Sequence, residues 1–81
     1  MWYVYFLELS NGNIYVGSTG DLKSRVERHS SGDVLSTRPF RPVTLRSYVA
    51  VETEARARRL ELYFKSGSGK AVALKRFIRD V

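Results

Sequence analysis

The stretch "WYVYFLEL", from Trp2 to Leu9, consists almost entirely of aromatic and aliphatic residues, with Glu8 as its single charge. Such a run predicts a β-strand that is buried on both faces. The dipeptide Asn11-Gly12 follows it and is a strong signal for a tight hairpin turn. The return strand is predicted over residues 13–17. The chain is therefore expected to begin with a β-hairpin whose first strand is fully buried.

The segment "TGDLKSRVERHSSG", residues 19–32, predicts the first helix. Asp21 suits the N-cap or the first turn, where a negative charge is favourable. Leu22, Val26 and His29 recur at helical spacing and indicate one face of that helix. The helix is expected to end at Ser30, Ser31 and Gly32.

The remaining residues predict one more strand and two more helices. Residues 33–42, which hold both prolines, are expected to form a loop, and residues 43–51 a third strand. Residues 53–65 predict a helix capped by Thr53, the glycine-rich residues 66–69 a break, and residues 70–80 a last helix. The buried helix positions are expected to be Ala57, Leu60, Phe64, Leu74, Phe77, Ile78 and Val81.

The predicted order of elements is therefore β-β-α-β-α-α. It predicts a single α+β domain, residues 1–81, in which a small three-stranded antiparallel sheet is flanked by three helices.

The chain carries a net charge of +6 and a pI of about 10.1. Such a charge attracts polyanions, and we expect nucleic acid rather than a membrane surface as the partner. A helix on a membrane would need an apolar face outside the core, and no apolar run approaches the roughly 20 residues that cross a bilayer. The absence of cysteine excludes disulfides and thiolate metal sites, and favours a reducing, cytoplasmic location.

The segment "SGSGKA" superficially resembles a phosphate loop. Phe64 and Ala71, however, stand where the Walker pattern needs a glycine and a hydroxyl, and the segment follows a helix. We therefore expect no nucleotide cofactor. The segment is predicted to be a flexible helix–helix joint, whose backbone N–H groups could still hold a phosphate of a nucleic acid.

The residues that suit phosphodiester hydrolysis are Tyr5, Tyr15, Arg25, His29 and Glu61. A single carboxylate suits magnesium, which keeps most of its waters, while arginine stabilises charge on a phosphate and tyrosine can pass a proton. Each residue also has a structural alternative. These are packing for the tyrosines, a solvated helix position for Arg25, a charge complementing the helix dipole for His29, and an ion pair with Arg58 or Lys65 for Glu61.

Three short motifs occur in order along the chain: "YVY" at Tyr3–Tyr5, "YVG" at Tyr15–Gly17 and "DLKSR" at Asp21–Arg25. This series strongly resembles the GIY-YIG nuclease family, and it is similar to the N-terminal nuclease domain of the bacterial nucleotide-excision-repair incision subunit. The later "RLELYFKSGSGK" resembles a segment of small stand-alone bacterial members. Each motif is weak alone, but the ordered series is specific and covers nearly the whole chain.

The resemblance implies a metal-dependent endonuclease that hydrolyses phosphodiester bonds in DNA with one divalent ion, Mg²⁺ or Mn²⁺. It implies that Tyr5 and Tyr15 are the tyrosines of the two motifs, with Tyr15 a candidate general base. It makes Arg25 the catalytic arginine and Glu61 the metal ligand. His29 stands where relatives carry tyrosine or histidine, so it is expected to accept a proton or assist the leaving group.

The chain also departs from the family pattern. Tyr3 replaces the glycine of the first motif, Ser18 stands where the repair subunit has lysine, and the late asparagine of many members has no counterpart. These departures keep open a nucleic-acid-binding module with weakened catalysis, and a protein–protein adaptor as a third hypothesis.

No separate DNA-binding domain is in view, so low sequence specificity is expected, with structure-selective or repair-related cleavage as further expectations. Gly17 is expected to let a phosphate or the following loop approach the strand end, and Ser18 is expected to lie near that phosphate. Salt-dependent phosphate contacts are expected from four cations: Arg38, Arg41, Lys65 and Lys70.

The hairpin makes the family hypothesis geometrically testable, because side chains alternate between the two faces of a strand. A two-residue loop, Asn11-Gly12, would put Tyr5 and Tyr15 on opposite faces. A three-residue loop that extends to Asn13 would put both tyrosines on one face. In that register the cross-strand pairs would be Leu9 with Tyr15 and Leu7 with Gly17. A shared site therefore predicts an odd loop, or a bulge, with positive φ at Gly12 or Asn13.

Overall fold

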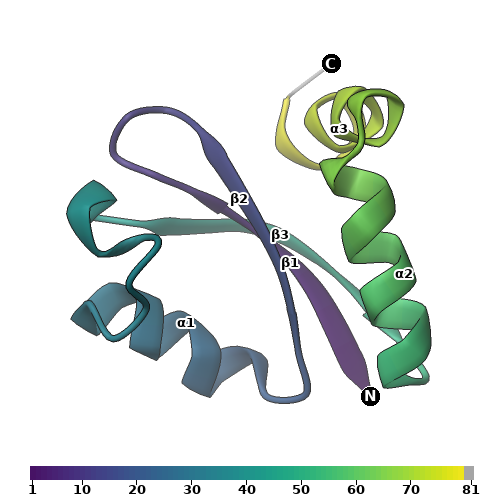
Figure 1. Ribbon diagram of the computed structural model, residues 1–81, viewed down its shortest axis with the longest axis horizontal. Helices are drawn as coiled ribbons and strands as arrows, with labels where there is room; N and C mark the ends of the chain where they lie inside the picture. Colours follow the sequence, from purple (N-terminus) through teal and green to yellow (C-terminus); the bar gives the residue numbers. More distant parts are fainter. Residues whose placement is uncertain (80–81) are drawn as a thin grey trace.

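A three-stranded antiparallel sheet forms the centre of the computed structural model, which describes residues 1–79. The strands are β1 (Trp2–Glu8), β2 (Ile14–Thr19) and β3 (Thr44–Val51), in the order β2-β1-β3. Because β1 lies between the other two, its residues Val4 to Leu7 are all buried. This confirms the predicted α+β fold, its element order and the doubly buried first strand (Figure 1).

The hairpin loop is odd-numbered, as a shared tyrosine face requires, but it starts one residue earlier than predicted. Leu9 N–H donates to the Asn13 carbonyl at 2.9 Å, so the loop is Ser10-Asn11-Gly12, and Gly12 has φ +85°. Ser10 N–H donates to the Phe40 carbonyl at 2.8 Å, which holds the loop in this register.

The predicted pairs of Leu9 with Tyr15 and Leu7 with Gly17 are therefore wrong by two residues along β2. Leu7 pairs with Tyr15, and Tyr5 pairs with Gly17. Residues that pair across two strands lie on the same face of the sheet, and so do residues two positions apart on one strand. Tyr15 pairs with Leu7, which is two positions from Tyr5, so Tyr5 and Tyr15 share one face.

The first two helices begin and end at the signals that the sequence carries. Helix α1 (Leu22–Ser31) is capped by the Asp21 carboxylate, which accepts from Ser24 N–H at 3.1 Å, and it ends at Gly32 with φ +87°. Helix α2 (Glu54–Lys65) is capped by the Thr53 hydroxyl.

The last helix differs from its prediction, because it includes most of the segment expected to be a flexible joint. Helix α3 (Gly67–Ala73) begins directly after Ser66, whose hydroxyl accepts from Gly69 N–H at 3.2 Å, and it continues as a π-helical turn, η2 (Leu74–Ile78). A Cβ on Gly69 would collide with the Tyr63 carbonyl of α2. The glycine therefore allows close packing of two helices, whereas flexibility was predicted. Of the predicted helix positions, Asp80 and Val81 lie outside the described residues.

The two faces of the sheet are covered by different helices. Helices α2 and α3 pack on the face that carries Val4, Phe6 and Val16, whereas α1 lies over the face that carries Tyr5 (Figure 1). On the α2 side the Phe6 ring stacks on Phe77 with a centroid distance of 5.4 Å. Of the residues predicted to be buried, Ala57 and Phe64 are buried in this core, while Leu60, Phe77 and Ile78 are partly buried and pack against it. Leu74 is also only partly buried. No helix within residues 1–79 is long and apolar enough to span a membrane.

Replacing Gly12 by alanine should destabilise the hairpin through the backbone alone, because its φ is +85° and a Cβ there would meet nothing within 4 Å. We expect a loss of about 1–2 kcal/mol in the free energy of unfolding, measured by urea denaturation. Gly67→Ala is the matched control, since a Cβ at Gly67 is also unobstructed but the residue lies in a helix with ordinary φ. That control should be neutral or slightly stabilising, and equal losses at both sites would contradict the assignment of the loop.

Candidate active site

Three buried polar side chains form a hydrogen-bonded chain between the sheet and α1. Tyr5 Oη lies 2.9 Å from His29 Nε2, and His29 Nδ1 lies 2.8 Å from Thr37 Oγ1. The Thr37 hydroxyl lies 3.4 Å from the Val34 carbonyl, to which it donates. Tyr5 is 2% exposed, while His29 and Thr37 are fully buried. Because a hydroxyl that donates to a carbonyl must accept from Nδ1–H, His29 carries its proton on Nδ1 and accepts from Tyr5 at Nε2.

The titration of these groups keeps the buried chain neutral. Burial lowers the pKa of His29, and the charges of Arg25 and Arg28 lower it further. Burial also raises the pKa of Tyr5 far above its usual range, with a further contribution from Tyr15. Tyr5 therefore remains a phenol, and His29 is not the dipole-complementing charge that was one alternative for it.

Gly17 is required by the position of Tyr5. The two residues are cross-strand partners, and a Cβ on Gly17 would fall against the Tyr5 hydroxyl and ring. The glycine at the end of the "YVG" motif thus gives the Tyr5 phenol room to lie across β2 and reach α1.

Tyr15 and Arg25 lie next to this buried chain but are half-exposed. The Tyr15 ring centroid is 6.3 Å from that of Tyr5 and 5.1 Å from that of His29. Arg25 precedes His29 by one helical turn, and its charge acts on both Tyr5 and His29. The aromatic residues predicted from the sequence therefore form one cluster, in which Tyr15 is the phenol that faces solvent.

Glu61 approaches the cluster from α2, on the opposite side of β2. Its carboxylate accepts from the Ser18 hydroxyl at 2.5 Å and from Lys65 Nζ at 2.7 Å, so the predicted ion pair with Lys65 is present. Burial alone would raise the pKa of Glu61, but the hydrogen bonds from Lys65 and Ser18 outweigh it and lower the pKa below its ordinary value. Lys65 Nζ also lies 6.0 Å from the Tyr15 ring centroid, which links Glu61 to the aromatic cluster.

The donor set around Glu61 fits a hydrated magnesium or manganese ion better than a protein-caged metal. Residues 1–79 contain no group of three or more His, Cys, Asp or Glu side chains that could hold a metal. A single ionised carboxylate is compatible with Mg²⁺, which usually keeps several waters and shares its remaining positions with substrate phosphates. Glu61 would have to exchange its contact with Lys65 for such an ion.

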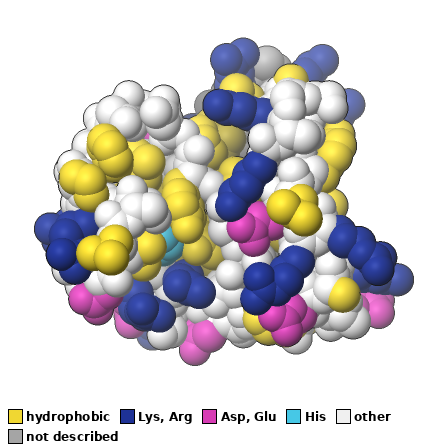
Figure 2. All heavy atoms as spheres, viewed as in Figure 1, with side chains coloured by type: hydrophobic (Ala, Val, Ile, Leu, Met, Phe, Trp, Pro, Cys, Tyr) yellow, Lys and Arg dark blue, Asp and Glu magenta, His cyan; other side chains and the backbone are white. Residues whose placement is uncertain are grey.

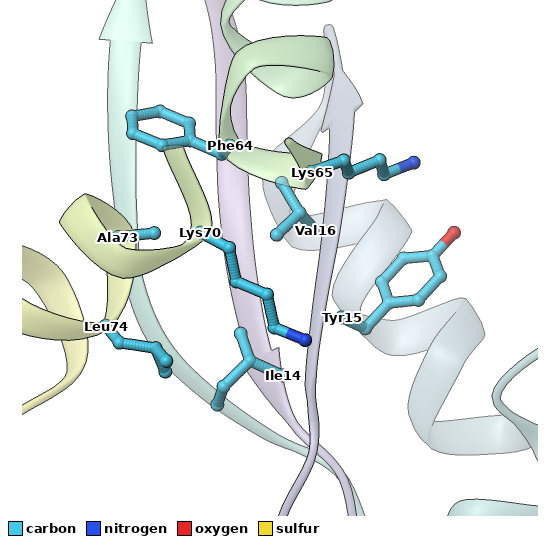
Figure 3. A pocket seen from close by; sticks show the side chains of 8 residues that line it. All are labelled: Ile14, Tyr15, Val16, Phe64, Lys65, Lys70, Ala73 and Leu74. Atoms are coloured by element: carbon cyan, nitrogen blue, oxygen red, sulfur yellow. The ribbon is translucent and has the colours of Figure 1, made fainter. Parts of the chain in front are cut away.

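The four predicted phosphate-binding cations lie in two places. Arg38 and Arg41 belong to the segment around the short helix η1 (Arg38–Phe40), where Arg38 Nε donates to the Gly32 carbonyl at 2.6 Å and Arg41 Nε donates to the Arg38 carbonyl at 3.1 Å. Both therefore shape their own loop. Lys65 and Lys70 border a hollow beside Tyr15 (Figure 3).

Sequence reasoning missed Thr37, which fixes the tautomer of His29. The residue lies in a segment without helical or strand periodicity, and nothing local marks it as different from Ser36 or Ser31. The contact of Ser18 with Glu61 was also not predicted, because it joins residues 43 positions apart.

Comparison with known proteins identifies the family. Residues 1–75 match the model of the GIY-YIG catalytic domain. The chain therefore belongs to the GIY-YIG family, whose fold is typically a nuclease fold and whose members generally use divalent metals.

The similar proteins are small UPF0213 proteins. The chain is 39% identical over 66 residues to that of Halobacterium salinarum, covering 80% of this chain and 86% of the relative. It is 37% identical over 70 residues to one from Streptococcus agalactiae, covering 85% and 80% of the two chains. A solution NMR structure of the UPF0213 protein of Bacillus halodurans matches with a TM-score of 0.58 and 33% identity, covering 93% of this chain and 84% of that one.

Thr37→Val should destabilise the protein, because it leaves the buried Nδ1–H of His29 without an acceptor. We expect a loss of about 1–3 kcal/mol in the free energy of unfolding, measured by urea denaturation. Thr37→Ser keeps the hydroxyl and should retain most of the stability. Equal losses in the two variants would show that the methyl group matters and the hydrogen bond does not.

Stability should fall as the pH drops below about 6.5, the ordinary pKa of histidine. Since the pKa of His29 is lowered in the folded state, the unfolded chain binds a proton first, and acid therefore favours unfolding. A further loss should follow below pH 4.5 from Glu61, whose pKa is also lowered.

Urea denaturation at pH 7.5 and pH 5.5 measures the first effect. His29 is the sole histidine, so His29→Gln should remove the difference between these two pH values. A variant that kept the full difference would exclude His29 as its source.

Proposed function

We propose that this protein is a metal-dependent endonuclease that hydrolyses phosphodiester bonds in DNA with low sequence specificity. The observation that carries the proposal is the convergence of the two motif tyrosines, Arg25, His29 and Glu61 around one end of β2. The contacts linking them are the Tyr5–His29 hydrogen bond, the Tyr15–His29 ring contact and the Lys65 bridge to Glu61. Tyr5 and Glu61 are 56 positions apart, and a simple adaptor would have no need to bring such residues together.

In this proposal Glu61 holds the divalent ion. Its lowered pKa keeps the carboxylate ionised at neutral pH, which is the form that binds a cation. The bound ion would neutralise phosphate charge and polarise the phosphoryl oxygen. Ser18 and Lys65 both donate hydrogen bonds to Glu61 in this structure, and Lys65 would be available to a phosphate if an ion took its place.

Tyr15 would take the proton of the attacking water as a phenolate, after releasing its own proton to solvent, since it is the solvent-facing tyrosine of the cluster. Tyr5 does not fit that role, because it is buried and its raised pKa keeps it protonated. Tyr5 and His29 instead position Tyr15 through ring contacts, and Thr37 holds the His29 ring. In this proposal His29 is a positioning residue, and takes neither of the two roles that the resemblance implies, proton acceptor or leaving-group aid.

Arg25 stabilises the charge that develops on the phosphate, as a half-exposed guanidinium next to the cluster. Lysine and arginine side chains are spread over the surrounding surface, in line with the net charge of +6 (Figure 2). Such contacts bind phosphates irrespective of base sequence, which supports salt-dependent binding of low specificity.

A second candidate function is a nucleic-acid-binding module without efficient catalysis. It is favoured by one observation: Glu61 is engaged by both Ser18 and Lys65, and an ion must compete with these partners. The two candidates differ in their response to metal, since a binding module would bind DNA equally well with or without it.

Glu61→Gln should reduce Mg²⁺- or Mn²⁺-dependent cleavage by about 100-fold or more, because the metal loses its charged ligand. The measurement uses end-labelled branched, nicked, single-stranded and duplex DNA with and without EDTA. Glu52→Gln is the matched control, because Glu52 is exposed and lies in the turn before α2.

Cleavage by the parent protein but not by Glu61→Gln, with the control unchanged, is the expected result. Salt-sensitive DNA binding without metal-dependent cleavage on any of these substrates would support the binding module instead. Absence of DNA binding altogether would contradict both.

A further inference from the structure

A hollow of about 210 Å³ lies directly beside the site, between β2 and the end of α2 (Figure 3). Its lining residues come from β2, α2, α3 and η2 and are Ile14, Tyr15, Val16, Phe64, Lys65, Lys70, Ala73 and Leu74. Tyr15 and Lys65 belong to both the hollow and the site described above. A ligand in this hollow would therefore touch the same tyrosine that faces the proposed reaction.

The walls of the hollow combine two chemistries. Most of its lining is aliphatic or aromatic, whereas Lys65 and Lys70 are exposed and stand at its border. In Figure 3 the Lys70 chain extends from α3 toward β2 and its amine ends near Ile14, while the Lys65 amine and the Tyr15 oxygen point to the other side. The space-filling view shows the same arrangement, with hydrophobic side chains inside a depression and Lys or Arg at its margin (Figure 2).

This combination suits a flat apolar group that carries an anion on each side. Sites for drug-sized molecules measure about 300–1,000 Å³, so the hollow is suited to a smaller group. A single nucleobase has apolar faces, and its flanking phosphates would meet the two lysines. An apolar peptide side chain or an acyl chain would fill the floor equally well but would bring no anion to the two ammonium groups.

We propose that the hollow binds one unpaired nucleobase of a DNA strand, with its neighbouring phosphates held by Lys65 and Lys70. This inference rests on the proposed function for its class of ligand, and adds the place where the strand is held. Because Tyr15 borders both regions, the bound base is adjacent to the phosphate that is cleaved. A base within a duplex must leave its stack to enter, which costs a few kcal/mol, whereas an already unpaired base does not pay this cost.

Binding in EDTA tests this inference separately from cleavage, with the whole chain and two duplexes that each contain a one-nucleotide bulge. One bulge carries a base and the other an abasic sugar, so length and phosphate charge are identical. We expect about tenfold tighter binding of the bulge with the base, in the range known for single-base stacking. With 2-aminopurine as the bulged base, its fluorescence should change on binding. Equal affinity for the two duplexes together with unchanged fluorescence would overturn the proposal.

Two variants locate the effect in the hollow. Leu74→Trp fills the space and should remove the tenfold preference, while Leu62→Trp, on the exposed side of α2, should keep it. Lys70→Ala should weaken the binding of both duplexes equally and reduce the slope of log affinity against log salt concentration by about 1. Lys75→Ala removes the same charge outside the hollow and is its matched control. Thermal unfolding by circular dichroism shows whether each variant is folded. A preference that survives in folded Leu74→Trp would place the base elsewhere and overturn the proposal.

The two proposals fail in different ways. A protein that prefers the bulged base but never cleaves contradicts the proposed function and leaves the base site intact. A protein that cleaves DNA but binds the abasic bulge equally well contradicts the base site alone.

Discussion

The Tyr5 phenol, lying across Gly17 and donating to His29, is the contact on which the site depends. It joins β1 to α1 through a hydrogen bond of 2.9 Å, and it is possible because no Cβ stands in its way on β2. In a chain of 81 residues the core is thin, so a buried polar group has to be fully satisfied. Thr37 completes that requirement by accepting from the second ring nitrogen of His29. This chain of hydrogen bonds ties α1, and with it Arg25, to the sheet.

The site consists of an inner layer that stays neutral and an outer layer that carries charge. Burial keeps Tyr5 protonated and His29 uncharged, so these groups hold their geometry over a broad pH range around neutrality. The outer residues Arg25, Glu61 and Lys65 remain partly in water, where ions and phosphates can replace their protein contacts. If these charged residues were buried, breaking their ion pairs would leave an unpaired buried charge, which is costly. The separation gives a rigid support and an exchangeable surface.

The sequence predicted the fold well wherever the determining interactions are local. The caps Asp21 and Thr53 and the turn at Gly12 depend on neighbouring residues, and all three lie where they were predicted. The predicted hairpin register was wrong by two residues along β2, because Ser10 is held by the Phe40 carbonyl, a partner 30 residues away. Thr37 was missed for the same reason.

The glycine-rich segment before Lys70 was interpreted as flexible although its glycine permits close helix packing. Composition alone could not distinguish the two, since the distinction lies in how near the Tyr63 carbonyl approaches Gly69. Of the five predicted chemical residues, Tyr5 and His29 are buried, whereas the other three are partly exposed. Whether His29 is exposed or buried depends on packing that no spacing rule describes.

The position of β2 at the edge of the sheet explains how one tyrosine can serve two surfaces. On a central strand, alternating side chains would point to faces that neighbouring strands keep apart. On an edge strand, a long ring can contact His29 on one face and still border the hollow formed with α2 and η2 on the other. Ile14 and Val16 flank Tyr15 and supply the apolar lining of that hollow. The alternation that brings the two tyrosines to one face thus also places an apolar surface beside them, and in the proposed function a strand of DNA would contact both surfaces.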